Sequence, residues 1–449
     1  MSAEIVPFPH SVTPITPIAH YIHLGDSGYQ KLADLHSSGR LPARRVIVDA
    51  SKMVRQRDLI DGLRKEGAEI VIDTKAAELS VVGKFSGRAK DAPWAKLNDG
   101  LPLSPDIFSA GHRTDIFGAI ARFAVEHRAH AVLAPSHCLA DPKFSGWFAV
   151  DQEACRLLRK ALDREGGQRI EIDFPVIVPH SMLNQDEFRR GLLEALPGLP
   201  FANLWIRAGN FGSDATAAGT AKFIGTLSGL HNLGRPIIAD HLGGLVGAAA
   251  IACGAVSGIG HGIGERERFD ANDWYKVPER RDDASFGRAV RIQIPGLDRS
   301  LTVSELQLLG SAKGGKALVA CGDRHCCPHG LRDMINEPRR HAAFQCFAAM
   351  DELAKTPDLR RETHFMKSAM EPSLSLASQV KELRPSAEDA RKLDINVDNL
   401  MKRLNEHAAR QRRMKLTLEH LFEQRGDRRP RAPPASLRGA AGEPRSHSV

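Results

Sequence analysis

Short apolar segments, several of them rich in β-branched residues, alternate with amphipathic segments between residues 44 and 327. The short segments have the length and composition of strands. They lie at 44–51, 68–75, 130–137, 172–179, 203–209, 235–241, 254–262 and 316–322. Most of them are uninterrupted apolar runs, which is typical of strands buried on both faces of a parallel sheet. This alternation restricts the chain to α/β folds built from strand–helix repeats.

The segments between the predicted strands have the periodicity of amphipathic or buried helices. They lie at 56–67, 115–129, 151–167, 184–198, 213–234, 243–254 and 302–315. Eight strands with intervening helices over roughly 280 residues predict a (β/α)8 barrel of the TIM type. An open doubly wound sheet is the rival fold. It predicts a glycine-rich phosphate-binding turn after the first strand, and "VIVDASKM" (46–53) contains no glycine.

This pattern divides the chain into an N-terminal segment (1–43), the barrel (44–329), a helical C-terminal extension (330–423) and a basic tail (424–449). The tail has six arginines against two acidic residues and is rich in Pro, Gly and Ser. It is therefore predicted to be disordered. Two long insertions, 76–113 and 263–301, follow the second and seventh predicted strands, and we expect both at the mouth of the barrel.

Composition restricts the compartment and the partners. The longest run of small apolar residues, 242–260, is interrupted by glycines and predicts a buried helix followed by a strand rather than a membrane span. The Pro-rich N-terminus lacks the pattern of a signal peptide. We therefore expect a cytoplasmic protein without a membrane partner. The net charge of +8 permits a nucleic-acid or phosphorylated substrate as well as a small molecule.

Polar residues follow the predicted strands where they end. Because the C-terminal ends of barrel strands meet at one mouth, where active sites are built, these residues are candidate site residues. The candidate catalytic residues are Asp49, Asp73, Asp240 and His261, and the candidate substrate-binding residues are Lys75, His137, His180, Arg207, Asn210 and His241. A lone strand-end aspartate is more often a helix cap. The prediction therefore depends on finding polar residues at the ends of all the predicted strands.

The stretch "ADHLGG" (239–244) ends the sixth predicted strand. Asp240 and His241 are adjacent, so only one of them can point into the barrel while the strand continues. Gly243 and Gly244 precede a predicted helix, which suits a substrate anion such as phosphate. A tight turn between strand and helix explains the same glycines equally well.

Two further strand ends allow more than one interpretation. His261 is flanked by glycines, and it could serve as a general acid or base or as a metal ligand. Arg207 favours recognition of a carboxylate or phosphate. A structural ion pair with Asp173 or Asp240 is the alternative for this arginine.

Three of the seven cysteines cluster in "CGDRHCCPHG" (321–330). Thiolates and imidazoles at short spacing favour Zn²⁺, which takes four S or N ligands in a structural site. The predicted ligands are Cys321, Cys326, Cys327 and His341, with His325 or His329 as substitutes for the imidazole. The alternatives are a nucleophilic cysteine paired with His325 or His329, and thiols without a function.

A barrel followed by a Cys/His cluster and a helical C-terminus resembles the tRNA-guanine transglycosylase family. "AIACGAVSGIGHGIGER" (250–266) is similar to the family's "A-x-A-x-G-V-D" segment, and "GDSGYQ" (25–30) is similar to its "D-S-G-G-F-Q". The resemblance implies base exchange on a nucleobase substrate beside a structural zinc. The family's aspartate nucleophile falls at Ile259 or at Ser257 nearby, so Asp49, Asp73 or Asp240 would take its role here.

Three functional hypotheses follow. The first is a transglycosylase-like barrel enzyme acting on a nucleobase or nucleotide, with a structural zinc. The second is a metal-dependent hydrolase or lyase that uses mouth histidines and carboxylates. The third is a non-catalytic barrel that binds partners, or a second copy of itself, through the long charged helix predicted at 396–424.

Overall fold

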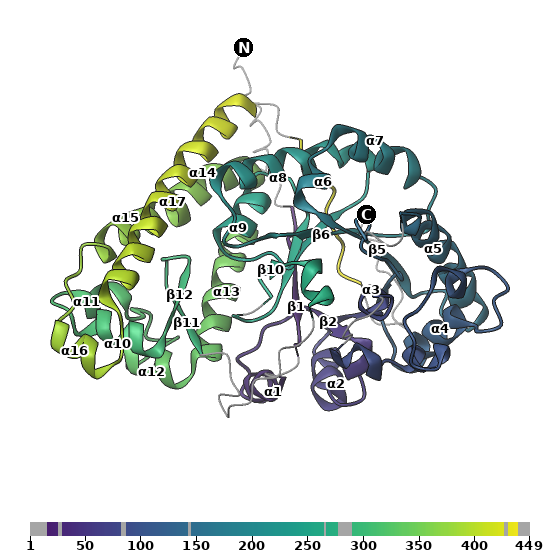
Figure 1. Cartoon of the computed structure of the whole chain (residues 1–449), viewed down its shortest axis with the longest axis horizontal. Coiled ribbons are helices and arrows are strands. Elements are labelled where there is room, and N and C mark those ends of the chain that lie inside the picture. Colours follow the sequence, from purple (N-terminus) through teal and green to yellow (C-terminus); the bar gives the residue numbers. More distant parts are fainter. Residues whose placement is uncertain are drawn as a thin grey trace, which may run out of the picture.

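A computed structural model of the chain describes residues 16–25, 29–81, 87–141, 145–264, 266–276, 290–425 and 430–438. Eight parallel strands close into a barrel at its centre, and helices surround them (Figure 1). In order around the barrel the strands are β1 (Ala19–His23), β2 (Arg45–Asp49), β3 (Glu69–Asp73), β4 (Ala131–Leu133), β5 (Glu171–Pro179), β6 (Leu204–Gly209), β8 (Ile237–Asp240) and β9 (Gly258–His261). The predicted (β/α)8 architecture is confirmed.

The alternation of side chains along each strand separates two apolar layers. Tyr21, Ile47 and Trp205 belong to a small core inside the barrel. Val46 and Val48, the neighbours of Ile47, point outward and join the larger core under the helices. Strands buried on both faces in this way explain the uninterrupted apolar runs of the sequence.

Helices cover the outside of the barrel in chain order. They are α1 (Tyr29–Ser37), α2 (Arg57–Lys65), α3 (Ala76–Leu79), α4 (Ile116–Glu126), α5 (Trp147–Arg164), α6 (His180–Leu183), α7 (Asp186–Ala195), α8 (Ala217–Gly229) and α9 (Gly244–Ala252). Between α3 and α4 the insertion forms the short 3-10 helices η2 (Gly87–Asp91), η3 (Pro93–Asn98) and η4 (Pro105–Phe108).

The first and last strands of the barrel differ from the predicted ones. The first strand is β1, which lies in the segment that we predicted to precede the barrel. The strand predicted at 316–322 is wrong, because this segment contains helix α11 (Gly315–Val319) and lies outside the barrel. The barrel strands therefore run from Ala19 to His261 rather than from residue 44 to residue 322.

A second core lies beside the barrel. It is built by the hairpin β11 (Arg291–Ile294) and β12 (Arg299–Thr302) with α10 (Val303–Ser311), α11, α12 (Leu331–Asn336), α15 (Glu371–Val380), α16 (Ala387–Lys392) and the first half of α17 (Val397–Arg425). The apolar residues of α13 (Pro338–Lys355) and α14 (Arg361–Phe365) pack instead in the outer core of the barrel. Figure 1 shows α13 standing between β1 and this hairpin. It contacts both α1 and α9, and so takes the place of the helix that follows the last barrel strand.

The chain after β9 lies over the mouth of the barrel. There β10 (Arg268–Phe269) pairs antiparallel with β7 (Phe211–Gly212), and the 3-10 helix η6 (Ala271–Tyr275) follows. Phe269 packs with Ala77 and Ile177 from other strand ends. Residues 266–276 of the predicted insertion (263–301) are thus at the mouth, as expected. Residues 291–301 belong instead to a hairpin beside the barrel, and residues 277–289 lie outside the described part of the chain.

The opposite end of the barrel is closed by residues 430–438. Ala435 is buried with the barrel's inner core, and the Arg438 guanidinium contacts carboxylates of Glu69, Glu171 and Asp173. The predicted disorder of the tail is therefore wrong for residues 430–438, because an arginine that neutralises buried carboxylates holds this segment in place. The rest of the predicted tail from 426 to 429 and from 439 onward lies outside the described residues.

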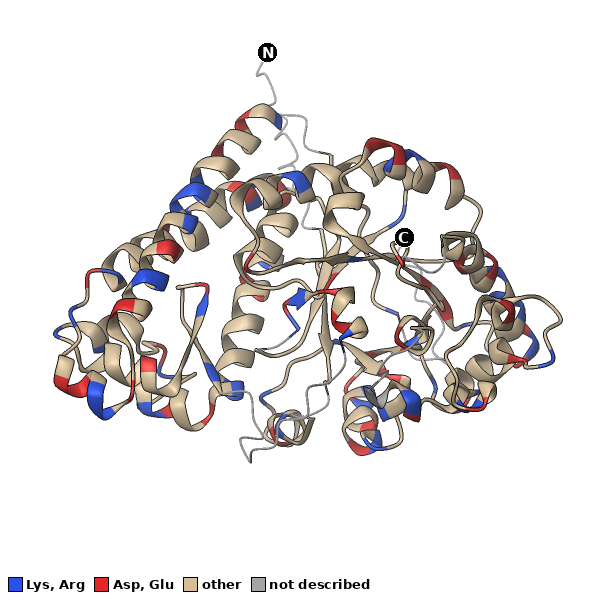
Figure 2. Ribbon diagram, in the orientation of Figure 1, with Lys and Arg blue, Asp and Glu red and all other residues tan. Residues whose placement is uncertain are grey.

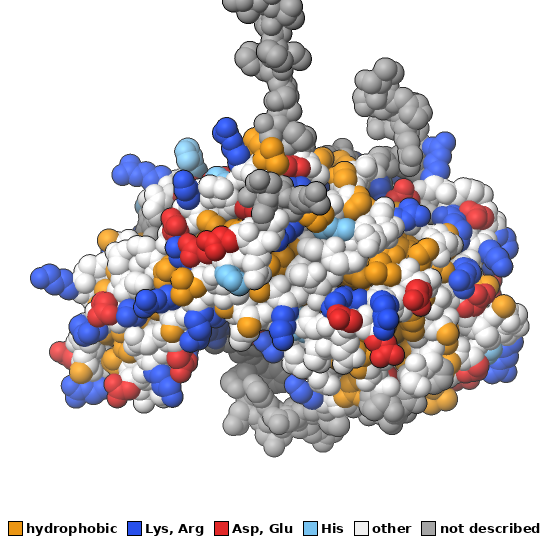
Figure 3. Space-filling view, turned by 90° about the horizontal axis from the view of Figure 1, so that it is seen from above, with side chains coloured by type: hydrophobic (Ala, Val, Ile, Leu, Met, Phe, Trp, Pro, Cys, Tyr) orange, Lys and Arg blue, Asp and Glu red, His pale blue; other side chains and the backbone are white. Residues whose placement is uncertain are grey.

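Charged residues of both signs lie along the outer helices, most visibly on α17 (Figure 2). On the face seen in Figure 3, the described Lys and Arg side chains are spread out with Asp and Glu between them. The positive net charge is therefore not gathered into one patch on the described part of this face. Among the described residues, no helix has the length and apolar character needed to cross a membrane.

Candidate functional site

A network of buried charges fills the mouth of the barrel. Arg207, near the end of β6, donates from Nε to Asp240 Oδ2 at 2.7 Å and from a terminal nitrogen to Asp73 Oδ2 at 2.8 Å. Asp73 Oδ1 accepts the backbone N–H of Lys75 at 2.9 Å. Alternation along β3, β6 and β8 points these three side chains at the barrel axis, so one arginine holds two aspartates together.

Asp49 lies at the end of β2 beside three cations. Its Oδ2 contacts the Lys52 ammonium and lies 3.4 Å from the Arg266 guanidinium. Its Oδ1 lies 3.5 Å from Lys75 Nζ and accepts no hydrogen bond from the described residues, although it is buried. Asp73 and Asp240, in contrast, accept hydrogen bonds at both oxygens. Of these three mouth aspartates, Asp49 is therefore the one with a carboxylate oxygen that accepts no hydrogen bond from the described residues.

These surroundings keep the carboxylates ionised. Burial alone would raise the pKa of Asp49, but the charges of Lys75, Arg266 and Lys52 together hold it well below its usual range. Burial opposes Arg207 and Lys75 in the same way at Asp73, whose pKa falls to about 2. Lys75 and Arg207 in turn have raised pKa values, because burial is outweighed by the facing carboxylates.

His23 completes the network from β1. Its Nε2 lies 2.7 Å from Asp240 Oδ1, and its Nδ1 lies 3.3 Å from an Arg266 nitrogen. Because arginine can only donate, Nδ1 is the acceptor and Nε2 carries the hydrogen that Asp240 accepts. Burial lowers the pKa of His23 despite Asp240, so the ring is neutral.

His241 stacks on the His23 ring at 4.8 Å between centroids and lies 3.9 Å from Asp240 Oδ2. Its Nε2 or Nδ1, a carboxylate oxygen of Asp240 and a ring nitrogen of His23 fall within 4.8 Å of one another, which is close enough to share a metal ion. The mouth therefore contains a candidate metal group as well as candidate acid–base residues.

Four residues after mouth strands adopt the left-handed conformation that favours glycine. They are Lys75 (φ 57°), Asn210 (φ 58°), His241 (φ 57°) and Arg266 (φ 56°). Non-glycine residues in this region cost about 1 kcal/mol or more each, and they concentrate at functional sites. Lys75, His241 and Arg266 belong to the charged network, whereas Asn210 lies in a separate cleft, and Asp99, Arg128, Asp298 and Asp394 adopt the same conformation elsewhere.

His137 lies away from this network, between β4 and the helices. Its Nδ1 is 2.6 Å from Asp151 Oδ1, its Nε2 is 2.9 Å from Ser80 Oγ, and the ring stacks on Trp147. The order Ser–His–Asp resembles that of a hydrolytic triad. However, the Ser80 hydroxyl donates to the Ala76 carbonyl, and all three polar side chains are buried. This chain of hydrogen bonds is structural.

His180 and Asn210 line a separate cleft of about 630 Å³ with Thr216 and Lys222, at the ends of β5 and β6 beside the start of α8. They do not contact the charged network in any hydrogen bond or ion pair among the described residues. The sequence therefore placed them correctly at strand ends but not in one site with Asp49.

The start of α9 does not present a free anion site. The backbone N–H of Leu245 donates to Asp298 Oδ1 at 2.9 Å. A Cβ at Gly244 would lie 2.5 Å from that carboxylate oxygen, and a Cβ at Gly243 would lie 2.9 Å from Glu267. The two glycines thus admit carboxylates of the chain itself, which corrects their predicted role in binding a substrate anion.

His261 also differs from its predicted position. Gly258 and Gly260 face the barrel axis, where a Cβ at Gly260 would meet Asp240 and Trp205. His261, the next residue after Gly260, consequently points outward toward α13, where it contacts His20 and Cys346. The His261 side chain therefore lies outside the mouth. The prediction that it acts there as a catalytic acid or base is wrong, because the ring points away from the barrel axis.

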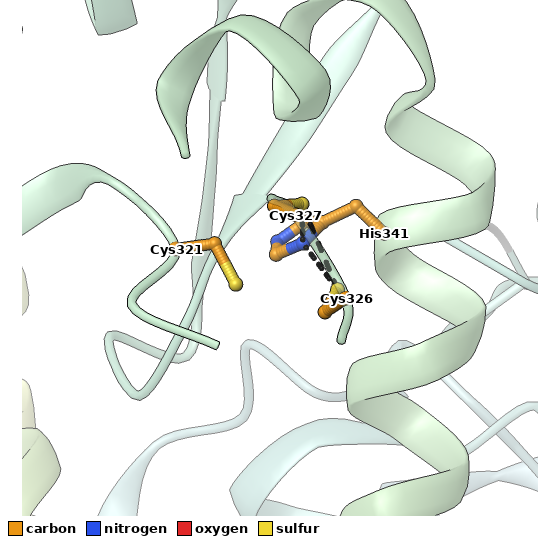
Figure 4. A group of neighbouring side chains, drawn as sticks. All are labelled: Cys321, Cys326, Cys327 and His341. Atoms are coloured by element: carbon orange, nitrogen blue, oxygen red, sulfur yellow. Dashed lines mark hydrogen bonds between the residues drawn. The ribbon is translucent and has the colours of Figure 1, made fainter. Parts of the chain in front are cut away.

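The four predicted metal ligands come together at the second core (Figure 4). Cys326 Sγ and Cys327 Sγ are 3.7 Å apart, and they lie 3.3 and 3.4 Å from His341 Nδ1. The Cys321 sulfur faces the same point, and all four ligand atoms are within 4.8 Å of one another. A tetrahedral zinc with bonds of about 2.0–2.3 Å separates its ligands by about 3.5–3.8 Å, so the spacing suits it.

The surrounding backbone fixes these ligands. Asp323 Oδ1 accepts the N–H groups of His325 and Cys326, and this turn presents the adjacent thiols. His341 Nε2 is 3.0 Å from the Gln293 carbonyl of β11. Nε2 therefore carries the hydrogen and leaves the Nδ1 lone pair for a ligand, which is the usual second contact of a metal-binding histidine.

The four ligands are buried, and His325 and His329 are exposed. His341, rather than either substitute, joins the cluster. Burial raises the pKa of Cys326 to about 11. A thiol this hard to deprotonate is a poor nucleophile, whereas a bound cation would stabilise the thiolate. A metal group is thus better supported than the nucleophilic cysteine.

No protein-family model matches the sequence, and no curated protein is similar enough to be matched to it. Function is therefore inferred from the arrangement of these residues alone.

Sequence reasoning missed His20, His23 and Cys346 as members of the two groups around β1. The signal for the first two was present, because "AHYIH" (19–23) alternates like a strand and places His23 at its end. Cys346 reaches its partners only through the tertiary fold, and spacing in the sequence carries no signal for such contacts.

Proposed function

We propose that the chain is a barrel enzyme that exchanges the base of a nucleobase or nucleotide substrate, with Asp49 as the nucleophile. The resemblance to the transglycosylases implies the reaction class. The observation that carries the choice of residue is the buried, ionised Asp49 carboxylate whose Oδ1 accepts no hydrogen bond from the described residues. An activated nucleophile needs a free lone pair and a charge that is held in place.

In this proposal Asp49 Oδ1 attacks C1′ of the sugar. The C1′–N bond breaks, its electron pair leaves with the outgoing base, and that base gains a proton. The incoming base then loses a proton and displaces the carboxylate. Lys75 and Arg266 hold Asp49 in position, and Arg207 keeps Asp73 and Asp240 ionised beside it. Such preorganised charges are the largest contribution in many enzymes.

Substrate must reach Asp49, which is 4% exposed. Arg266 contacts it from the segment that lies over the mouth, and Phe269 of the same segment packs on His241. The proposal therefore includes displacement of residues 266–276 when substrate binds.

We propose zinc as the ion held by Cys321, Cys326, Cys327 and His341. Four buried S and N ligands leave no position for substrate, which is the property of structural zinc sites. The ion would join the Cys-rich loop (residues 320–330) to α13 and supply no chemistry at the mouth.

A metal-dependent hydrolase or lyase is the second candidate, and the group of His23, Asp240 and His241 favours it. An ion there would have to replace the hydrogen of His23 Nε2, which Asp240 accepts, and would compete with Arg207 for the same carboxylate. This candidate predicts a metal that is lost in His241→Ala and retained in Cys327→Ser and Cys346→Ala.

Transfer of labelled guanine into bulk tRNA by the full chain tests the base-exchange proposal. Asp49→Asn alone removes one negative charge beside Lys52, Lys75 and Arg266, so the matched variant is Asp49→Asn/Lys52→Met, which keeps the net charge. We expect incorporation by the wild type and a loss of at least 100-fold in the double variant. No incorporation by the zinc-loaded wild type, or equal rates in both proteins, overturns the proposal.

A further inference from the structure

A second group of metal-type ligands lies outside the barrel, where β1, β9 and α13 meet. His20 Nε2 and His261 Nε2 are 3.1 Å apart, and each is 3.5 Å from Cys346 Sγ. This group shares no residue with the mouth network or with the Cys-rich cluster. Neither the structural zinc nor the base-exchange proposal uses it.

The barrel determines the position of both imidazoles. Ile22 of β1 lies opposite His261 of β9, and His20 lies opposite Ile259. Ile22 and Ile259 belong to the core under the helices, so His20 and His261, which share their faces, also point outward. Paired parallel strands thus hold the two rings diagonally across one ladder, with centroids 5.1 Å apart.

Helix α13 supplies the third ligand. His341 and Cys346 are five residues apart on this helix, which places them about 140° apart around its axis. His341 accordingly faces the Cys-rich loop while Cys346 faces β1 and β9. Figure 1 shows α13 between the two parts of the molecule.

Hydrogen bonds orient the ligand atoms inward. His261 Nδ1 lies 2.7 Å from the Gly262 carbonyl, so Nδ1 carries the hydrogen and Nε2 presents its lone pair to the group. The Phe347 ring packs edge-on against His20 at 5.2 Å. A carbonyl contact behind the ligating imidazole is the usual outer contact of metal sites, and His341 has the same arrangement with Gln293.

We propose that His20, His261 and Cys346 bind a second divalent transition-metal ion, of which Zn²⁺ is the best match. Imidazole and thiolate together suit such ions. Tetrahedral bonds of about 2.0–2.3 Å give ligand separations of about 3.3–3.6 Å, close to the distances between these atoms.

This second site differs from the first in its coordination. Three protein ligands leave one position of a tetrahedron for water or another exchangeable ligand, as in catalytic zinc sites. His20 and Cys346 are half-buried. The first site, in contrast, has four buried ligands.

Metal content of the full chain after zinc loading and desalting tests this site. We expect two equivalents in the wild type and one in each of Cys346→Ala and His20→Ala, whose side chains are only half-buried. Cys155→Ala, a buried cysteine of α5, is the control and should retain two. Cys327→Ser should lose the other equivalent.

Cobalt loading separates the two sites further. Cys346→Ala should lose only part of the thiolate-to-metal charge-transfer band, and azide should change the spectrum of the wild type but not that of Cys346→Ala. Wild-type stoichiometry in both Cys346→Ala and His20→Ala overturns the second site. An azide response that persists in Cys346→Ala overturns its open position. Neither outcome affects the base-exchange assay.

Discussion

Asp49 and Asp240 are equally buried, but their side chains have different surroundings. Asp240 is fully hydrogen-bonded by His23, Arg207 and a backbone N–H, whereas Asp49 Oδ1 is not hydrogen-bonded within the described residues. A sequence shows two strand-end aspartates and cannot distinguish them. The difference arises from Arg207, which reaches across the barrel interior to Asp73 and Asp240 but does not contact Asp49.

Replacing the Asp49 carboxylate should lower stability as well as activity. Asp49→Asn removes the carboxylate charge that Lys52, Lys75 and Arg266 share, and breaking a buried pair in this way costs about 3–5 kcal/mol. Asp49→Asn/Lys52→Met should recover part of that loss in urea denaturation and remain inactive. Asp58→Asn, on the exposed face of α2, should match the wild type. Full recovery of activity together with stability would show that Asp49 is structural.

Acid should unfold the barrel through these aspartates. The pKa of Asp73 is about 2 in the folded protein, against about 4 in an unfolded chain. Its stabilising contribution, about 2–3 kcal/mol, is therefore complete above pH 4 and is lost as the pH falls from about 4 to 2. Urea denaturation of Asp73→Asn should vary less over this range than that of the wild type. Parallel pH profiles for the two proteins would contradict this assignment.

Helix α13 joins the barrel to the second core. Ala342 and Ala343 pack in the barrel's outer core, while His341 faces the Cys-rich loop. The segment 337–355 was predicted as a helix, but nothing in its sequence indicated that its two faces belong to different cores. That division becomes visible only when β1 and β9 close the barrel.

The two errors in strand assignment have physical causes. "KALVACG" (316–322) is apolar like a buried strand, and a short run of this kind cannot be told from a buried helix turn by periodicity. Gly314 with φ 77° starts α11 at this point. "AHYIH" was missed because His20 and His23 interrupt its apolar pattern. These histidines are the residues through which the strand contributes to the mouth and to the group outside the barrel.

Removing zinc should loosen α13 and the hairpin before the barrel. Chelation would free His341 from the cysteines and weaken its hold on the Gln293 carbonyl of β11, since a structural site binds its metal only when folded. We expect hydrogen exchange to accelerate at least tenfold in 338–355 and 291–302 and to change little in α4. Equal acceleration in α4 would show that the metal stabilises the whole molecule instead.

The molecule as a whole is a barrel closed at both ends by later parts of the chain. Residues 266–276 lie over the mouth, and residues 430–438 close the opposite end. The fold class followed from the strand–helix repeat, because each repeat leaves its own local pattern. The long insertion after the seventh predicted strand indicated that the mouth would be covered. The closure of the opposite end could not be predicted, because Arg438 lies in a polar segment whose partners are distant in the sequence.

Arg438 should matter for stability although it belongs to a segment without regular secondary structure. Arg438→Met would leave Glu69 and Asp173 buried without a facing charge from this segment, which costs about 3–5 kcal/mol. Thermal and urea denaturation should show the loss, and Arg438→Lys should restore part of it. Arg360→Met, at an exposed position, is the control. A stability change below 1 kcal/mol in Arg438→Met would mean that the barrel end does not depend on this closure.

Chemical trapping decides whether Asp49 forms the bond to substrate. The zinc-loaded full chain would be mixed with tRNA without free base, quenched in acid and digested for mass spectrometry. We predict a covalent sugar–protein adduct on the peptide that contains Asp49, and none in Asp49→Asn/Lys52→Met. An adduct on a peptide without Asp49, or labelled base exchange without any adduct, would contradict Asp49 as the nucleophile.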